Sequence, residues 1–559
     1  MSASNKKKLR KEQEAAALTE KQLAEQKEAK KLKIYTIAFV AIMALVVVIG
    51  LSTIIGNTIS TSGIIERGTT AVTLNDKEIT AAELSYYYMD SINSFYSNAA
   101  SQYGDYASMI IQYNYGLDLS KPLNTQKYYG DEKTTWADYF VDSAISNAKS
   151  IYALNELAVK EGHKMGEDEQ TALDYALSNL NRQATEAGYH TAKEYLQGMY
   201  GYGASVDTYK EYLTMSAMAD SYYIAHADSL SYDDAAIRAY EKDHYNEYSS
   251  YSFSYYYLSS DSFLEGGTKG EDDKVTYSDE EKKAALAKAE EAAKSLLTAN
   301  STVLLEKAVK ALEINKDNKN AAITTVENAL YSDSKIPSVI RDWVTADERK
   351  QADIEVVPNT TTSTDAEGNE LSVTSGYYVV LFDSSRDNNS KMANVRHLLV
   401  AFEGGKKTED GNTVYSDEEK AAAKAKADQL LKQWMDGDAT EESFAALATE
   451  HTDDDGSKAT GGLYEDINDD TTFVEPFLKW SLADHKPGDT EIIETEYGYH
   501  IMYYSSTDEL TYRDAMISTT LKNNDIEAWY NKIVDAVTVK EGDTSKLRLD
   551  LVLTTPSAS

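Results

Sequence analysis

The hexapeptide YSDEEK occurs twice in the chain, at Tyr277–Lys282 and again at Tyr415–Lys420. Each copy follows a polar stretch that contains glycine, and each opens a run rich in alanine, lysine and glutamate. Runs of this composition favour an α-helix. The sequence therefore predicts the same helix start at two places.

The similarity extends well beyond the hexapeptide. Three further pairs of segments occur in the same order: Tyr251–Ser260 with Asn394–Phe402, Ile340–Val357 with Phe477–Thr495, and Ser375–Ser385 with Tyr497–Ser506. Four landmarks in one order predict a duplicated domain of strand, helices, strand, loop and strand. We expect each copy to be an antiparallel sheet flanked by helices, within a chain of the α+β class. Residues 358–375, an extra polar segment of the first copy, are expected to form an exposed hairpin tip.

The composition excludes several classes of protein. The 559 residues are too many for one ordinary domain, and 42% hydrophobic with 26% charged residues is typical of a globular protein. A net charge of −37 argues against nucleic acid as a partner, because phosphate binding needs clustered lysine and arginine. The chain has no cysteine, which excludes disulfide bonds, thiol nucleophiles, cysteine-ligated zinc and a lipidated N-terminal cysteine.

Tyrosine is unusually frequent, with 42 tyrosines against 10 phenylalanines. Its side chain combines aromatic area with a polar hydroxyl, so it serves both partly wet cores and adaptable binding surfaces. For the tyrosine-rich stretches Tyr86–Tyr88 and Tyr103–Tyr115 we favour core packing, and a binding surface is the alternative.

Residues Ile34–Ile55 form an uncharged apolar run long enough to cross a bilayer. A segment rich in lysine and arginine precedes the run, and the first basic residue after it is Arg67. The positive-inside rule then places residues 1–33 in the cytoplasm and the chain after Asn57 outside it. We expect a retained single-pass anchor. A cleaved signal peptide and a buried core helix are the alternatives; the run is long for the first, and the basic flank disfavours the second.

The region between the membrane segment and the duplication is predicted to be mostly helical. Two short strands lead to Thr80, a natural helix N-cap, and a long amphipathic pattern ends at Gly162, a natural C-cap. A helix at Asn524–Val537 and a β-prone piece at Lys546–Thr555 follow the duplication and are expected to pack on this helical region. The predicted division is residues 1–33, cytoplasmic segment; 34–55, transmembrane helix; 56–68, linker; 69–250, helical domain; 251–390 and 391–507, the two copies; and 508–559, C-terminal helix and tail.

Four motifs distinguish the second copy: RHLLV with His397, TEHTDDDGSKATGGLYEDI, FVEPFLKW, and TEYGYHIMYY with His500. In this order they resemble a parvulin-type peptidyl-prolyl isomerase domain, over about residues 394–506. The wider layout of anchor, helical region and parvulin domains resembles the extracytoplasmic foldases of the PrsA and SurA type. The resemblance implies a chaperone role for residues 69–250 and cis–trans isomerisation by residues 391–507.

The resemblance also implies which residues make the site. The candidate catalytic residues are His397 and His500, which would lie on neighbouring strands within one hydrogen-bond network, and Asp454, which would lie beside the substrate amide. Phe473 and Phe477 match the two apolar positions that form the pocket for the proline ring.

Further residues are expected to complete the substrate-binding face. Met502 lies two residues beyond His500, so strand alternation places it on the same face of the sheet. Gly461 and Gly462 fit a tight turn into the pocket rim. The usual family motif G-G-D-L-G is here GGLYE, residues 461–465, which predicts a rim of changed shape. His451 and His485 match no motif position and are expected at the surface.

Isomerisation of an X-Pro bond needs no nucleophile, metal or cofactor. The barrier of about 18–20 kcal/mol arises because the amide loses resonance as it twists. A site therefore has to hold the proline ring in apolar surroundings and stabilise the twisted amide. Ala401 and Phe402 stand where phosphate-specific parvulins begin a basic cluster. This difference disfavours a phosphorylated substrate, although Lys406 and Lys407 lie nearby.

The first copy lacks this set of residues. Tyr255 or its neighbour occupies the first histidine position and Tyr378 the second, and no Gly-Gly turn or equivalent of Asp454 lies between them. We therefore expect a degenerate parvulin-like domain that serves for binding or spacing. The expected function of the chain is isomerase and chaperone for unfolded secreted polypeptides with X-Pro bonds, outside the cytoplasmic membrane. The alternatives are a non-catalytic holdase or scaffold with both copies inactive, and a cell-surface assembly protein that uses the duplication as spacing.

Overall fold

The computed structural model describes residues 62–129, 133–269, 275–364, 370–408, 411 and 413–553. The chain divides into two compact units, Met1–Ser231 with Lys522–Ser559, and Tyr232–Leu521. The predicted membrane segment, residues 34–55, lies outside the described residues, as does the basic segment before it. Within the described ranges, no helix is both long and apolar enough to span a bilayer.

The first unit begins with a short hairpin that runs directly into a helix. β1 (Thr70–Leu74) pairs antiparallel with β2 (Lys77–Thr80), and α3 (Ala81–Tyr103) follows. The Thr80 hydroxyl accepts a hydrogen bond from the Glu83 backbone N–H, and the Glu83 carboxylate accepts one from the Thr80 N–H. This capping box pairs two N–H groups that the helix start would otherwise leave free, and it confirms Thr80 as the N-cap.

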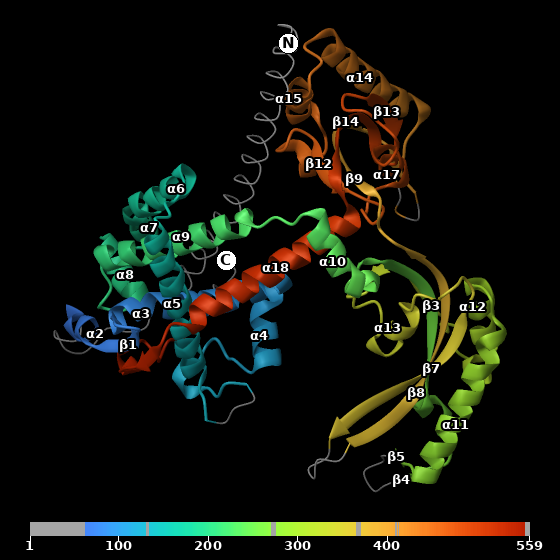
Figure 1. Cartoon of the computed structure of the whole chain (residues 1–559), viewed down its shortest axis with the longest axis horizontal. Helices are drawn as coiled ribbons and strands as arrows, with labels where there is room; N and C mark the ends of the chain where they lie inside the picture. Colours follow the sequence, from blue (N-terminus) through green and yellow to red (C-terminus); the bar gives the residue numbers. More distant parts are fainter. Residues whose placement is uncertain are drawn as a thin grey trace. The chain divides into compact units, whose positions relative to one another are not determined.

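Helices make up most of the remainder of this unit (Figure 1). The longest, α5 (Trp136–Glu161), packs against α3 and α9 (Val206–Ser229). It ends at Gly162, whose φ of 72° confirms the predicted C-cap. The other helices are α2 (Ile64–Gly68), η2 (Gly104–Tyr106), α4 (Ala107–Tyr115), η3 (Leu123–Thr125), α6 (Glu167–Ser178), α7 (Leu180–Glu186) and α8 (Ala192–Tyr200).

The C-terminal residues complete the core of this unit. The part of α18 (Tyr512–Asp535) from Lys522 onward belongs to it, and β15 (Val539–Glu541) pairs antiparallel with β1. The prediction of a strand in Lys546–Thr555 is wrong for its described part. After η8 (Thr544–Lys546) the chain to residue 553 is irregular, and its leucines are buried in the core of the unit instead of facing a partner strand.

The tyrosine-rich stretches of this unit differ in burial. The side chains of Tyr86–Tyr88 are buried within the core, as predicted. In the second stretch, Tyr106 and Tyr113 expose 67% and 87% of their surface, so the prediction of core packing is wrong there. The reason is that η2 and α4 present these rings on a face that no described element covers.

The second unit contains two four-stranded sheets of the same design (Figure 1). The first has the strand order β6–β3–β8–β7 and the second the order β12–β9–β14–β13, with every pair antiparallel. Helix α10 (Asp234–His244) and η4 (Tyr245–Tyr248) precede them. We call the elements from β3 to β8 the first module and those from β9 to β14 the second module.

The elements of the two modules follow one another in equivalent order. The first module consists of β3 (Ser250–Ser259), η5 (Ser260–Phe263), β4 (Thr268–Lys269), β5 (Val275–Thr276), α11 (Asp279–Ser295), η6 (Leu296–Thr298), α12 (Thr302–Ala311), η7 (Glu313–Asn315), β6 (Thr324–Leu330), α13 (Ser338–Val344), β7 (Ile354–Thr364) and β8 (Glu370–Arg386). The second consists of β9 (Lys391–Ala401), β10 (Lys406–Lys407), β11 (Thr413–Val414), α14 (Asp417–Asp436), α15 (Glu441–His451), α16 (Asp455–Lys458), β12 (Leu463–Ile467), α17 (Glu475–Ser481), β13 (Thr490–Glu494) and β14 (Gly498–Thr511).

Helices cover both faces of each sheet. In the first module α11 and α12 pack on one face and α13 on the other (Figure 1). In the second, α14 and α15 cover one face and α17 the other. Side chains of the central strands alternate between these faces, so each module buries two apolar layers.

The two copies of YSDEEK have the same local structure. Ser278 and Ser416 are the N-caps of α11 and α14, and each forms a capping box with the glutamate three residues later. The same glutamates, Glu281 and Glu419, also accept the backbone N–H of a preceding glycine, at 2.9 Å in both modules. The hexapeptide therefore fixes the helix start and also ties it to the loop before it.

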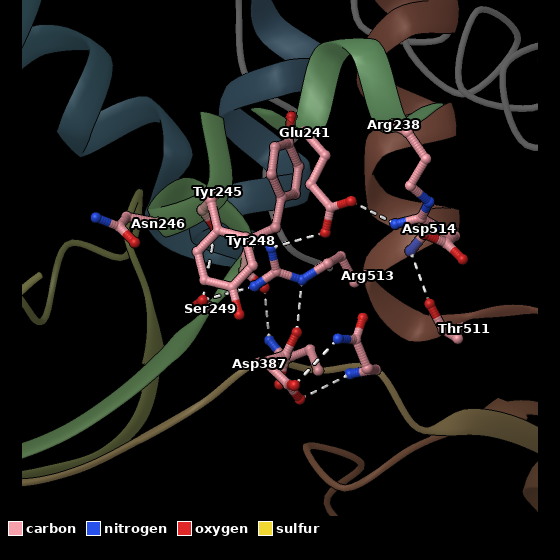
Figure 2. Close-up of polar contacts among 12 residues, drawn as sticks. Arg238, Glu241, Tyr245, Asn246, Tyr248, Ser249, Asp387, Thr511, Arg513 and Asp514 are labelled. Atoms are coloured by element: carbon pink, nitrogen blue, oxygen red, sulfur yellow. Dashed lines mark hydrogen bonds and ion pairs between the residues drawn. The ribbon is translucent and has the colours of Figure 1, made fainter. Parts of the chain in front are cut away.

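A buried arginine holds three segments of the second unit together (Figure 2). Arg513, at the start of α18, is fully buried and donates to the backbone carbonyls of Asp387 and Tyr245 at 2.6 and 3.0 Å. It also donates to the Ser249 hydroxyl at 2.6 Å, and the Glu241 carboxylate balances its charge at 3.3 Å. The connection between the modules is thereby fixed to the segment before the first module and to the helix after the second.

Candidate active site

The central strands of the second sheet bring two buried histidines together. His397 lies on β9 and His500 on β14, and the strands pair with Met502 opposite His397 and Leu399 opposite His500. Residues two apart on a strand lie on one face, so both histidines and Met502 face α17. The Nδ1 atoms of the two rings are 3.0 Å apart.

Polar groups at the two ends of this pair extend its hydrogen bonding. The ionised Asp454 carboxylate, 2.9 Å from His397 Nε2, can only accept, so that nitrogen carries a proton. His397 Nδ1 is hydrogen-bonded to His500 Nδ1, and His500 Nε2 is hydrogen-bonded to the Thr495 hydroxyl at 2.8 Å. Burial is the main cause that lowers the pKa of His500 to about 3. The result is a continuous chain of hydrogen bonds from Thr495 to Asp454.

Asp454 is the N-cap of α16 and collects donors from three elements. Its Oδ2 accepts from His397 on β9, from the Ser457 hydroxyl on α16 and from the Tyr464 hydroxyl on β12, the last at 3.0 Å. Its Oδ1 accepts the Gly456 N–H at 3.2 Å. The hydrogen bond from His397 is the main cause that holds the pKa of Asp454 well below its usual range. The side chain is 23% exposed, so an ionised carboxylate remains accessible from solvent.

The Gly461–Gly462 turn connects this carboxylate loop to strand β12. Both glycines have positive φ, 66° and 78°. A Cβ on Gly462 would lie 2.1 Å from the His397 carbonyl oxygen, and the Gly462 carbonyl accepts the His397 N–H at 2.8 Å. Only glycine permits both the backbone conformation and the close approach to β9.

Aromatic rings lie beside the histidines. Phe477, on α17, is buried, with its ring centroid 5.1 Å from that of His397 and 5.4 Å from that of His500. Phe473 is half-buried and lies 4.8 Å from Phe477 between centroids, and Met502 is fully buried in the same cluster. The residues predicted for the site thus lie on the α17 face of the second sheet, at the N-cap of α16 or in the Gly461–Gly462 turn.

Three residues of the site were not predicted from the sequence: Ser457, Tyr464 and Thr495. The Ser457 hydroxyl is hydrogen-bonded to Asp454, and the Thr495 hydroxyl is hydrogen-bonded to His500. Tyr464 contacts Asp454 with its hydroxyl and His397 with its ring. Tyr464 carried a usable signal, because it stands in the altered GGLYE motif. The other two carried none, because single hydroxyl residues in polar loops are common.

Other candidates in this region have structural roles. The ring of His485 lies tilted against that of Trp480, with centroids 4.2 Å apart, so His485 is half-buried and less exposed than predicted. His451 is partly exposed at the end of α15. Asp453 accepts the Ala401 N–H at 3.0 Å and thus holds the loop to β9. In the described part of the chain, no group of three or more His, Asp or Glu side chains is arranged to hold a metal ion.

The first module has different side chains at the equivalent places. Gly376 lies opposite Ser259 in the first sheet as Gly498 lies opposite Ala401 in the second. Counting from these glycines, Tyr378 takes the place of His500 and Tyr255 that of His397. Their rings are 5.7 Å apart between centroids, and a third ring, that of Tyr257, lies 4.7 Å from Tyr378. The first module therefore has an aromatic cluster where the second has its hydrogen-bonded histidines.

With this geometry in view, comparison with known proteins gives the class. Residues 377–506 match the family described as PPIC-type PPIASE domain. The chain therefore contains a parvulin-type peptidyl-prolyl cis–trans isomerase domain, and the resemblance found in its motifs is confirmed for this region. The match begins in β8, the last strand of the first module, ahead of the boundary predicted at residue 391.

A curated relative of the chain is a foldase. Foldase protein PrsA of Clostridium botulinum (strain 657 / Type Ba4) is 39% identical over 69 residues, which are 12% of this chain and 20% of that protein. The chain thus spans about a fifth of the length of this curated relative.

Solved structures of PrsA are also similar to parts of the chain. PrsA from Bacillus subtilis covers 72% of this chain and 88% of its own, with 13% identity and a TM-score of 0.24. The match to PrsA from Bacillus cereus covers 26% of this chain and 49% of that chain, with 22% identity and a TM-score of 0.15. With TM-scores this low, we draw no conclusion from either overlap.

Proposed function

We propose that the chain is a membrane-anchored foldase that acts outside the cytoplasmic membrane. Its second module would isomerise X-Pro bonds of secreted polypeptides, with His397, Asp454 and His500 as catalytic residues. Phe473, Phe477, Met502 and the Gly461–Gly462 turn would bind the substrate. The observation that carries the proposal is the continuous hydrogen-bond chain that ends on an ionised Asp454 beside an aromatic cluster.

This arrangement suits amide rotation because no bond has to be made or broken. Resonance gives the carbonyl oxygen of a planar X-Pro amide a partial negative charge, and twisting the amide reduces that charge. An ionised Asp454 facing this oxygen would disfavour the planar form relative to the twisted one, which lowers the barrier. His397 and His500 would keep the carboxylate oriented, and the rings of Phe473 and Phe477 would hold the proline.

An exposed aromatic stripe in the first unit supports the chaperone part of the proposal. Tyr106, Met109 and Tyr113 expose 67%, 58% and 87% of their surface. They are three and four residues apart on and just before α4, so they lie on one face of it. Apolar surface of this kind is typical of sites that bind other chains. We propose that unfolded clients bind here, while the segment 34–55 anchors the protein.

The test is an isomerisation assay of the full-length protein on a short unphosphorylated peptide with one Ala-Pro bond. Uncatalysed exchange takes tens to hundreds of seconds, so NMR exchange spectroscopy detects even a modest catalyst. We expect faster exchange, with no preference for a peptide whose residue before proline is phosphoserine. Unchanged exchange together with suppressed aggregation of an unfolded client would favour the non-catalytic holdase instead.

A further inference from the structure

Tyr464 is an unusual residue for its position in the isomerase domain. The family motif G-G-D-L-G corresponds to residues 461–465, so Tyr464 occupies the position of the leucine. A leucine there offers apolar surface only. The tyrosine adds a ring of larger area and a hydroxyl, and the structure shows a contact for each.

The ring of Tyr464 belongs to the aromatic cluster of the site. Its centroid lies 4.9 Å from that of Phe473, 6.2 Å from that of Phe477 and 5.4 Å from that of His397. The ring is half-buried on β12, the strand that follows the Gly461–Gly462 turn. It therefore forms one wall of the region proposed to hold the proline.

The hydroxyl of Tyr464 points to the carboxylate. It donates to Asp454 Oδ2 at 3.0 Å, the same oxygen that accepts from His397 and Ser457. Burial, followed by this hydrogen bond, raises the pKa of Tyr464 to about 12, so the phenol keeps its proton. His397 and Ser457 hold Asp454 from β9 and α16, whereas Tyr464 reaches it from β12 across the pocket region.

We propose that Tyr464 is a positioning residue of the isomerase site, which orients the Asp454 carboxylate through its hydroxyl and walls the proline pocket with its ring. The inference rests on the proposed function, because it gives Asp454 a role in catalysis. A site with leucine at this position has no such donor. The tyrosine thus couples the rim of the pocket to the carboxylate that acts on the amide.

The experiment measures kcat and KM of the full-length protein for the Ala-Pro peptide with Tyr464→Phe, Asp454→Asn and both together. Tyr464→Phe keeps the ring, so KM should stay within about twofold while kcat falls about tenfold, the effect of one hydrogen bond to a charged group. In the Asp454→Asn background the same substitution should cause no further loss, because the two residues act as one unit. Tyr464→Leu should raise KM as well, since it removes the ring.

Tyr415→Phe is the matched control. Tyr415 is half-buried against Phe402 in the same module and makes no contact with Asp454, so its substitution should leave both constants unchanged. The inference is overturned if Tyr464→Phe has wild-type kcat, or if it lowers kcat equally in the presence and absence of the Asp454 carboxylate. Wild-type rates for Asp454→Asn would overturn the proposed site together with this inference. Near-ultraviolet circular dichroism establishes that each variant is folded.

Discussion

The two modules of the second unit have the same framework and differ on one face. Both sheets have the same strand order, both helix starts have the same capping box, and both central pairs need a glycine at the same place. A Cβ on Gly376 or Gly498 would lie 2.2 Å from a carbonyl oxygen of the neighbouring strand. On the face covered by α17, the second module has His397 and His500. On the equivalent face of the first module, covered by α13, the corresponding residues are Tyr255 and Tyr378.

This difference shows that the fold does not depend on the site. Two apolar layers and the backbone pairing stabilise each module, and the tyrosine rings of the first module fill the space that the histidines occupy in the second. In the first module, aromatic packing takes the place of the hydrogen-bond chain. Residues that the fold does not need, but that nevertheless form a continuous hydrogen-bond network, are therefore the ones to test for function.

The largest effect is expected from substitutions at two matched positions, one in each module, which distinguish a role in packing from a role in catalysis. Phe477 and Ile340 are each the third residue of the helix on this face, α17 or α13, and both are buried. Either residue changed to alanine should lower the free energy of unfolding by about 2–5 kcal/mol. Only Phe477→Ala should also lower the isomerisation rate per folded molecule. Urea unfolding and the peptide assay measure the two quantities, and equal rate losses in both variants would refute the distinction between the modules.

The next effect is a dependence of stability on pH that only the second module should show. His500 has a folded pKa of about 3, below its ordinary value, so between pH 6.5 and 3 the unfolded chain binds a proton that the folded chain excludes. Stability is therefore full above pH 6.5 and falls by about 1.4 kcal/mol for each pH unit below it. Protonation of Asp454 also lowers the stability of the fold, because its pKa in the folded chain is lowered. This loss occurs only at more acidic pH, since a carboxyl group titrates below a histidine.

Hydrogen exchange resolved by strand measures this difference. Protection of β14 should fall between pH 7 and pH 5, after correction for intrinsic exchange rates, whereas protection of β8 should not, because Tyr378 does not titrate in this range. His500→Phe should remove the dependence in β14. A similar loss of protection in both strands would show that the burial of His500 is not its source.

The smallest effect is expected from an attempt to restore a site in the first module. Tyr255→His with Tyr378→His removes ring contacts of half-buried side chains, and we expect a loss of about 1 kcal/mol. No isomerase activity should appear, because the first module has no counterpart of Asp454 or of the Gly461–Gly462 turn. The assay is made in an Asp454→Ala background, where any new activity is visible. Restored exchange there would mean that two histidines suffice.

The features that the sequence predicted correctly depend on local or periodic signals. The N-cap at Thr80, the two helix starts at YSDEEK and the C-cap at Gly162 each rest on residues within one helical turn. The duplication was visible because four landmarks recur in order, and the strand register bears out Tyr255 and Tyr378 as the counterparts of the histidines.

What the sequence could not predict depends on contacts between distant segments. Tyr464 reaches Asp454 only because the Gly461–Gly462 turn folds β12 back against β9. The exposure of Tyr113 depends on which elements cover α4, and no periodic pattern contains that information. The leucines after Lys546 alternate as in a strand, yet the core of the first unit buries them without strand pairing.

The measurement that tests the central claim most directly is the isomerisation rate of the full-length protein with Asp454→Ala, compared with Tyr378→Ala. The claim is that catalysis resides on the α17 face of the second module and depends on the carboxylate of Asp454. We expect Asp454→Ala to lower kcat/KM about a hundredfold or more, as the loss of a preorganised electrostatic group does elsewhere. Tyr378→Ala should leave it within twofold of the wild type. A rate that survives Asp454→Ala, or that falls as far with Tyr378→Ala, would contradict the account.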